Sequence, residues 1–355
     1  MKQPQPQKKS FPFSEVISAL LDTGKAFSPR YLHSFSDLNP KDLEDLKKAW
    51  PRVPADRRVN LVEDLENVMD SDTLVNFDNV ARFALDDEDA RVRAVAMRLL
   101  WETDDTRLVP IFTRMMQKDP DPVVRASAAT ALGMFVYLGE LEEIRRDIHD
   151  LVVSDLLDEY ETGTDALVRR RVLESLGFSS NERIPALIQA AFDSNSSDWM
   201  ASALFAMGRS ADNRWEPAVL SSLDHPTPDV QLEAVRAAGL LELGTARQHL
   251  TDLLTREEEV EVDEDVVDAA IWALSQIGGE GVRETLEELL EKTEDEEQAS
   301  YIEDALDNLL MTENMNDGLG MFEFDLEKGE GLDFDLDEET DDDEDKKKPA
   351  KKSGK

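Results

Sequence analysis

The chain contains the stretch DPDPVVRASAATALG at residues 119–133, in which two Asp-Pro pairs precede a run rich in alanine. Within the run, Val124, Ala128, Ala131 and Leu132 follow one another at spacings of four, three and one, which places them on one face of a helix. Acids and prolines just before such a run are typical of a helix N-terminus. The stretch therefore predicts a helix that packs a stripe of small side chains against its neighbours.

The same pattern recurs along the chain. Its copies align on Leu65, Leu100, Leu132, Leu176, Met207, Ala238, Leu274 and Leu306, at successive intervals of 35, 32, 44, 31, 31, 36 and 32 residues. A second amphipathic segment follows each first one, as at residues 184–192 and 282–290, and the pattern shows no alternation of period two. Two helices in each unit predict an all-α fold, an α-solenoid of about eight stacked helical hairpins.

Acids and glycines mark the expected ends of the first helix in each unit. Asp119, Asp121, Asp229 and Asp265 stand where a carboxylate caps a helix or lies in its first turn. At or near the other end are Gly133, Gly177, Gly208, Gly239 and the pair at 278–279. We expect these glycines to end the first helices in the left-handed conformation.

The block Asp-x-x-Val-Arg-x-x-Ala-x-x-Ala-Leu-Gly resembles the HEAT repeat, in the short form of the phycobilisome-lyase type. The resemblance covers about residues 40–311 and implies a binding scaffold. It also implies a structural ladder in which the motif's arginine pairs with acids of adjacent units, at Arg58, Arg93, Arg125 and Arg169. Later units have Met200, Gln231, Val267 and Ala299 at that place. We expect the ladder to stop halfway and the C-terminal units to be less regularly stacked.

The repeats divide the chain into four parts. We predict a disordered N-terminus at 1–10, a helical cap at 11–56, the HEAT-repeat solenoid at 57–311 and a disordered acidic tail at 312–355 that ends in a lysine-rich segment. In the cap, Asn39 and Pro40 begin a helix that runs to Trp50. The interval of 44 residues predicts a lengthened second helix at about 141–160, which either packs on adjacent layers or protrudes to bind a partner.

Charge and composition limit the classes of function. The chain of 355 residues has 79 acidic and 39 basic side chains and a net charge of -40, of which the tail carries -9 and residues 1–311 carry -31. This balance argues against nucleic acid as a partner and favours a protein with a basic surface. The absence of cysteine excludes disulfides and thiolate chemistry. No apolar run suits a membrane span or a signal peptide, which predicts a cytoplasmic protein without membrane contact.

Two features of the tail point to docking. The segment FEFDL at 322–326 is echoed by LDFDL at 332–336, and alternating acidic and large apolar residues are typical of linear binding motifs. The candidate docking residues are Phe324, Leu326, Phe334 and Leu336. A solubilising tail with incidental apolar residues is the alternative. The six lysines at 346–355 either fold back onto the acidic solenoid or extend away with the tail.

Residues that could carry chemistry are scattered. No two of His33, His149, His225 and His249 share a helix face, so we predict no zinc site. In a related enzyme, deoxyhypusine hydroxylase, His-Glu pairs hold iron, but Ser34, Asp150, Pro226 and Leu250 follow the histidines here. Trp101 and Trp272 fall inside helical stripes and are expected in the core. We predict no catalytic residue, no cofactor and no metal.

These observations predict a non-enzymatic scaffold that binds another protein through its acidic solenoid surface and its tail. We expect the second helices to line a concave face. Candidate partner-binding residues on or beside them are Arg107, Arg114, Arg145, Arg183, Trp215, Glu216, Arg247, Glu284 and Glu287. The alternative is an enzyme or enzyme subunit, either a lyase that handles a bilin chromophore or a HEAT-like DNA glycosylase.

Overall fold

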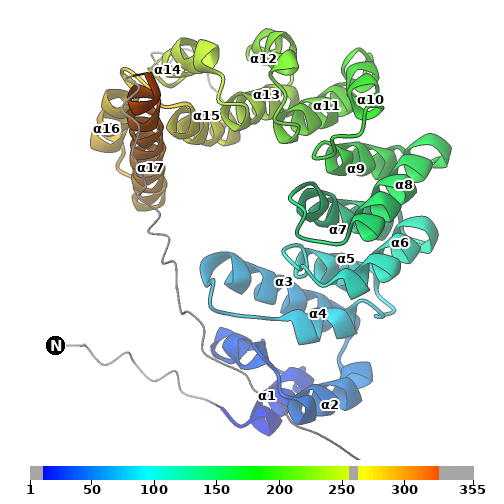
Figure 1. The fold of residues 1–355 in the computed structure, drawn as a ribbon. Helices are drawn as coiled ribbons and strands as arrows, with labels where there is room; N and C mark the ends of the chain where they lie inside the picture. The colour runs from blue at the N-terminus through cyan, green and yellow to red at the C-terminus, as the bar shows by residue number, and fades with distance from the viewer. Residues whose placement is uncertain (1–10, 256–262, 328–355) are drawn as a thin grey trace, which may run out of the picture.

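The structure is a computed structural model that describes the backbone of residues 11–255 and 263–327, and side chains in these ranges up to residue 313. All regular elements in these ranges are helices, which confirms the predicted all-α solenoid. Figure 1 shows the helices stacked in chain order into an arch, with the N-terminal helices at one end and α16 and α17 at the other.

A helical cap begins the array. It consists of α1 (Phe13–Leu21), the 3-10 helix η1 (Pro29–Phe35), α2 (Pro40–Ala49) and the 3-10 turn η2 (Trp50–Arg52). The Asn39 side chain caps α2 by accepting hydrogen bonds from the backbone N–H groups of Lys41 and Asp42, and Pro40 is the first helical residue, as predicted. The rings of Phe13 and Phe35 pack edge to face inside the cap, with centroids 5.7 Å apart.

Pairs of helices follow the cap. The first helices of the pairs are α3 (Ala55–Ser71), α5 (Ala90–Arg98), α7 (Pro122–Glu140), α9 (Ala166–Leu176), α11 (Ser197–Arg209), α13 (Pro228–Leu240), α15 (Glu264–Ile277) and α17 (Glu296–Glu327). The second helices are α4 (Asp78–Ala84), α6 (Val109–Lys118), α8 (Arg146–Thr162), α10 (Ile184–Phe192), α12 (Glu216–Ser222), α14 (Arg247–Thr255) and α16 (Val282–Lys292). Short 3-10 turns precede three of these, η3 (Thr106–Leu108), η4 (Asn213–Trp215) and η5 (Gly244–Ala246).

The two sets of helices lie on opposite sides of the arch. Successive first helices pack against one another along the whole array, whereas close packing between second helices occurs at α6–α8 and α14–α16. Because the more closely packed set lies on the inside of a curve, the first helices form the concave side, as Figure 1 shows. We call this side the inner face and the side formed by the second helices the outer face. The prediction that second helices line the concave face is wrong.

Glycines allow this close packing. A Cβ atom built on Gly133 would lie 2.8 Å from Ser175 Oγ, and one on Gly177 would lie 2.8 Å from the Ala206 backbone. The same close contact recurs between Gly208 and Ala237 and between Gly239 and Ala273. The expected left-handed helix end is found at Gly278, where φ is +60°, while Gly133, Gly208 and Gly239 lie within helices and Gly177 has φ of -53°. Gly177, Gly208 and Gly239 do lie at or near the ends of their helices, but together with Gly133 they are contact points between layers and not left-handed helix ends.

The extra residues of the long interval lengthen two helices rather than one. Helix α7 continues past Gly133 to Glu140, and a turn with Glu142 at φ of +60° leads into α8. The predicted lengthened second helix is α8, but it begins at Arg146 and not at about 141, because Leu141 ends the preceding helix. Helix α8 packs against α6, α7 and α9, which agrees with local packing and not with a protruding arm.

Helix α7 is also the most apolar long helix in the described ranges. It is the one helix there with the length and hydropathy of a membrane span, and 56% of that stretch is buried inside the protein. Its Ala128 side chain is fully buried, as the stripe of small residues predicts. The packing of α7 against α5, α6, α8 and α9 accounts for this apolar composition.

The last helix passes the predicted end of the solenoid. Helix α17 continues from Glu296 to Glu327, so the expected boundary between 311 and 312 falls inside it. Glu313, beyond that boundary, pairs with Arg283 of α16 at 2.6 Å between Oε2 and Nη2. Residues 328–355 lie outside the described residues.

Candidate functional site

Arginines of the repeat motif join consecutive layers in the N-terminal half. The Arg58 side chain is 4% exposed and contacts both oxygens of the buried Asp87 carboxylate at 3.1 Å. Arg93 donates two hydrogen bonds to Asp119, at 2.9 and 2.7 Å. Each acid lies in the turn before the next first helix, so the pair connects neighbouring units. Hydrogen bonding to Asp119 also raises the pKa of Arg93.

The ladder changes character in the middle of the chain. Arg125 contacts Asp165, the residue that caps α9, at 3.4 Å. Arg169 instead donates to the Tyr160 backbone carbonyl at 2.7 Å and lies over the rings of Tyr160 and Trp199. In a later unit, Gln231 of α13 donates to the Leu223 carbonyl at the end of the preceding helix α12, at 2.9 Å. Units that lack the motif arginine therefore also lack the ladder contact with an acid of the next unit.

The inner face carries exposed apolar side chains on successive first helices or just after them. Trp101 is 51% exposed and Trp272 is 38% exposed, so the prediction that both belong to the core is wrong. Trp272 lies on α15, and Trp101 lies in the turn that follows α5. Further exposed apolar side chains of this kind are Val123, Tyr137 and Leu240.

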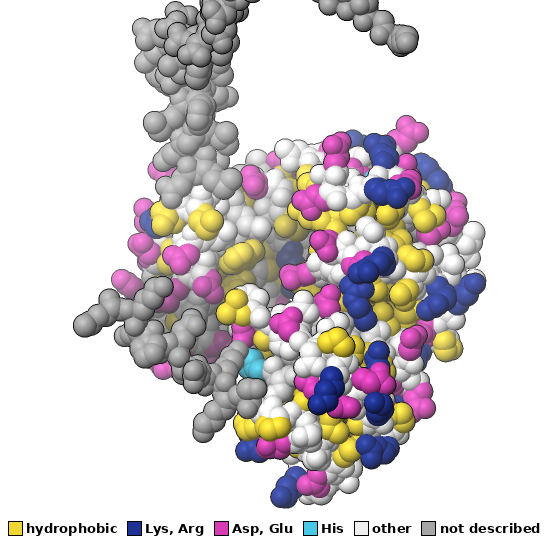
Figure 2. Space-filling model, turned by 60° about the horizontal axis from the view of Figure 1, so that its bottom comes forward, with side chains coloured by type: hydrophobic (Ala, Val, Ile, Leu, Met, Phe, Trp, Pro, Cys, Tyr) yellow, Lys and Arg dark blue, Asp and Glu magenta, His cyan; other side chains and the backbone are white. Residues whose placement is uncertain are grey.

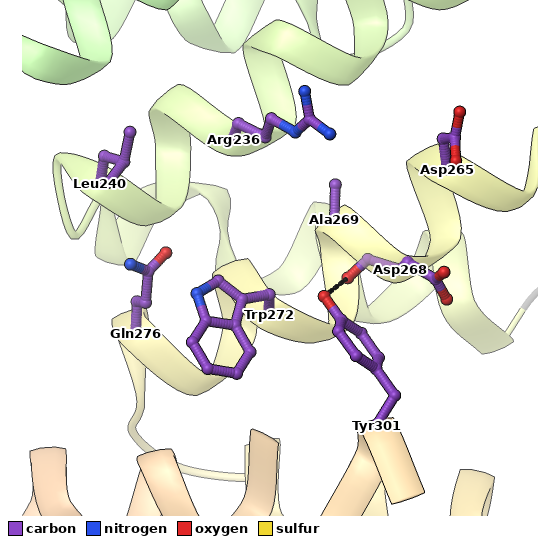
Figure 3. Close-up of a pocket in the computed structure, with 8 residues that line it drawn as sticks. All are labelled: Arg236, Leu240, Asp265, Asp268, Ala269, Trp272, Gln276 and Tyr301. Carbon is purple, nitrogen blue, oxygen red and sulfur yellow. Dashed lines mark hydrogen bonds between the residues drawn. The ribbon is translucent and has the colours of Figure 1, made fainter. Parts of the chain in front are cut away.

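Two hollows lie between first helices. The N-terminal groove, of about 310 Å³, lies between α5, α7 and α9 and is lined by Met97, Arg98, Trp101, Val123, Leu167 and Arg171, among others. The C-terminal groove, of about 390 Å³, lies between α13, α15 and α17. Figure 3 shows its lining residues Arg236, Leu240, Asp265, Asp268, Ala269, Trp272, Gln276 and Tyr301.

Paired charges occupy the inner ends of α9, α11 and α13. The buried Glu174 carboxylate accepts hydrogen bonds from Arg171 and from the Ser202 hydroxyl, the latter at 2.7 Å. The Arg209 guanidinium lies over two aromatic rings, and burial lowers its pKa to about 10. Burial raises the pKa of Glu233, which accepts a hydrogen bond from Arg236 at 2.8 Å. The Arg171–Glu174 and Arg236–Glu233 pairs lie within α9 and α13, and the hydrogen bond from Ser202 to Glu174 connects α9 with α11.

Charge differs sharply along the array. Residues 90–183 contain 17 acidic and 13 basic side chains, whereas residues 263–313 contain 17 acidic and two basic ones. In the view of Figure 2, most Lys and Arg side chains lie on the right, whereas acidic side chains occur on both sides. The last layers therefore supply much of the acidic surface.

The predicted partner-binding residues mostly lie on the outer face. Arg107, Arg114, Arg145, Glu284 and Glu287 are exposed there. Trp215 is 4% exposed, so its ring is part of the core and cannot contact a partner. Its place at the start of a second helix turns the side chain toward the interior.

Three other predicted residues make contacts within the protein. Arg183 pairs with Glu161, and Glu216 accepts a hydrogen bond from Thr245 at 2.7 Å. Arg247 donates to the Gly278 carbonyl at 2.6 Å, which ties α14 to the end of α15. In the tail, residues 324 and 326 lie in the helical backbone of α17, and residues 334 and 336 lie outside the described residues.

The histidines are separate and engaged locally. The contacts are His33 with Asp72, His149 with Glu140, His249 with Asp224, and His225 with the Thr227 amide. Within 11–255 and 263–313, no group of three histidine, aspartate or glutamate side chains is placed to hold a metal ion.

Comparisons with known proteins identify the repeats. A family model for HEAT repeats matches residues 80–177 and 184–262. No curated protein matches the chain. Similar solved structures include the Escherichia coli protein YibA, with 18% identity and a TM-score of 0.40 over 80% of this chain and 97% of that one.

Two further solved structures are similar to the same extent. The complex of CpcE and CpcF of phycocyanin lyase from Nostoc has 21% identity and a TM-score of 0.43, over 65% of this chain and 94% of that one. Human deoxyhypusine hydroxylase in complex with glycerol has 15% identity and a TM-score of 0.33, over 85% and 96%. At this level of similarity, nothing about function follows from these three proteins.

Proposed function

The chain is a HEAT-repeat protein, and on that basis we propose that it is a non-enzymatic scaffold that binds another protein along its inner face. The observation that carries the proposal is the series of exposed apolar side chains on the first helices, from Trp101 and Val123 to Leu240 and Trp272. Aromatic side chains of this kind are enriched in the energetically important part of protein interfaces. An extended partner segment would contact several layers at once.

The partner in this proposal has a basic surface. The strong acidic excess of residues 263–313 favours association with positive charge. At the N-terminal groove, Arg98 is already held by the Glu66 carboxylate at 2.5 and 2.8 Å. The acidic excess of the C-terminal layers therefore sets the sign of the partner's charge.

A binding role is also supported by the way ionisable groups are used. The described histidines contact residues of neighbouring helices or turns, and the inner carboxylates Glu174 and Glu233 pair with arginines. Visible absorption from a chromophore bound to the purified protein would contradict the proposal and favour the lyase alternative.

The test compares the two faces. The full chain, the inner-face variant Trp101→Ala/Trp272→Ala and the outer-face control Leu151→Ala are used to capture proteins from native extract, and mass spectrometry quantifies them. The control removes a similarly exposed apolar side chain of the second helix α8, since Leu151 is 54% exposed. We expect a partner that the wild type and the control retain and the inner-face variant loses. Loss from the control alone, with equal thermal stability by circular dichroism, would contradict the proposal.

A further inference from the structure

The C-terminal groove combines an exposed aromatic surface with carboxylates. The rings of Trp272 and Tyr301 pack against each other with centroids 6.2 Å apart and planes inclined by 36°. The Tyr301 hydroxyl donates to the Asp268 backbone carbonyl at 3.2 Å, which holds α17 against α15. Figure 3 shows Trp272 in the middle of the groove, with Asp265 and Asp268 on the same helix toward one end.

The carboxylates of this groove repel one another. The pKa of Asp268 is raised, first by burial and then by the negative charges of Asp265 and Glu264. A positive charge placed beside them would relieve this repulsion. Trp and Tyr rings also attract ammonium and guanidinium groups and pack against the aliphatic stems that carry them. The groove is therefore suited to a lysine-rich segment.

We propose that the lysine-rich end of this same chain, residues 346–355, binds in the C-terminal groove, with lysine stems on Trp272 and Tyr301 and ammonium groups beside Asp265 and Asp268. The segment has six lysines and no acid, which complements the acidic layers around the groove. This inference rests on the proposed function in treating the inner face as the binding surface. It adds a way to regulate partner binding, because the lysine-rich segment competes with a basic partner for the C-terminal groove.

The length of the chain permits this contact. From Tyr301 to the end of α17 at Glu327 the helix is about 39 Å long. Residues 328–345 number 18 and can span about 60 Å when extended. Eleven of them are acidic, and repulsion between like charges favours extended conformations of such a linker. Residue 346 can therefore return along α17 to the groove.

The N-terminal groove is a less suitable site for the same segment. Its walls include Arg98 and Arg171, whose charges oppose lysine. It is lined by α5, α7 and α9, whereas the chain leaves the array through α17, which itself forms a wall of the C-terminal groove. Charge and connection to the chain both favour the C-terminal groove.

Energy transfer in the full chain tests the proposal. Because the chain has no cysteine, the substitutions Gln298→Cys and Lys355→Cys create the only two labelling sites for a donor and an acceptor dye. We expect efficient transfer at low salt and about a twofold loss at about 0.5 M salt, where surface charges are strongly screened. Trp272→Ala and Asp265→Asn should each reduce transfer at low salt, and the matched control Trp101→Ala should leave it unchanged.

Several outcomes would overturn the proposal. Transfer that is equal in wild type, Trp272→Ala and Asp265→Asn shows that the segment does not occupy this groove. Transfer between separately labelled chains after mixing shows that a second copy occupies it. Asp265 is exposed, so Asp265→Asn remains informative even if Trp272→Ala disturbs the fold. The measurement needs no partner, so its failure is distinct from a failure of the proposed function.

Discussion

The two halves of the arch differ in whether a motif arginine helps to join neighbouring layers. From α3 to α9, the layers are connected by buried or half-buried pairs such as Arg58 with Asp87 and Arg93 with Asp119. From α9 to α15, close contacts connect them, as between Gly177 and Ala206. The last pair, α15 and α17, uses side-chain hydrogen bonds, including Asn308 to Ser275 at 3.0 Å. The comparison shows that the stacking of HEAT-type layers does not depend on the arginine ladder.

Removing an arginine of the ladder should produce the largest effect. In Arg58→Ala, the buried Asp87 carboxylate loses its positive partner, and we expect a loss of about 3–5 kcal/mol in the free energy of unfolding. The matched change Gln231→Ala, at the same motif position in the other half, should cost about 1 kcal/mol because it removes one neutral hydrogen bond. Urea unfolding followed by circular dichroism measures both. Equal costs would remove the distinction between the halves.

A methyl group at a glycine contact should produce the next largest effect. In Gly177→Ala, the new Cβ would lie 2.8 Å from backbone atoms of Ala206, and overpacking should cost about 1–3 kcal/mol. The control is Gly244→Ala, where the nearest atom is a side-chain nitrogen of Arg247 at 3.7 Å. Thermal unfolding should show a lower midpoint for the first variant and little change for the second. A tolerated methyl at 177 would mean that α9 and α11 can separate without cost.

Two carboxyl groups, one in each half, should also respond to pH with opposite signs. Hydrogen bonds from Arg107 and Arg82 lower the pKa of Asp105, so its contribution to stability is present above the ordinary value of 3.8 and is lost as the pH falls further. Burial raises the pKa of Glu233 above the ordinary 4.5, so stability is lost as the pH rises through the folded pKa.

Two variants separate these contributions. At pH 7, Asp105→Asn should lower the free energy of unfolding and Glu233→Gln should raise it. The Glu233→Gln difference should shrink at pH 4, because the native carboxyl group becomes protonated. The Asp105→Asn difference should persist at pH 4, because the pKa of Asp105 in the folded protein lies below 3.8. Urea unfolding at pH 7 and pH 4 measures them. A Glu233→Gln variant that is less stable than the wild type at pH 7 would show that its pairing with Arg236 outweighs its burial.

Hydrogen exchange should show the smallest difference. The loss of arginines suggested that C-terminal units would stack less regularly, but glycine contacts continue through α13 and α15. We therefore expect amides of α11 and α13 to exchange about as slowly as those of α5. Exchange that is much faster throughout residues 197–240 than in α5 would support the expectation that the C-terminal units stack less regularly.

The sequence predicted the layers better than it predicted the surfaces. The spacing of apolar residues predicted the bounds of α10 and α16 closely, and Asn39 was correctly predicted to cap α2. Both helices of each unit are amphipathic, however, and amphipathicity alone does not show which set lies on the inside of the curve. For that reason Trp101 and Trp272 were assigned to the core and Trp215 to the surface, which is the reverse of their exposure.

A signal for the inner face was present in the composition of the first helices. Alanine and glycine gather there, and small residues allow helix axes to approach more closely than the larger side chains of the second helices do. The turn at 141–145 was harder to predict because the residues that form it also fit a continuous helical stripe.

The glycine contacts have a consequence for the shape of the whole molecule. Each one brings two neighbouring first helices close together, whereas close packing between the second helices outside them occurs at α6–α8 and α14–α16. Each layer is thinner on the inner face, where a glycine allows close approach, than on the outer face. These differences add up along the chain to give the curvature of the arch. A larger residue at Gly177 or Gly208 would increase the inner spacing between two layers. The parts of the arch on either side would rotate relative to each other, and the two ends of the arch would move apart.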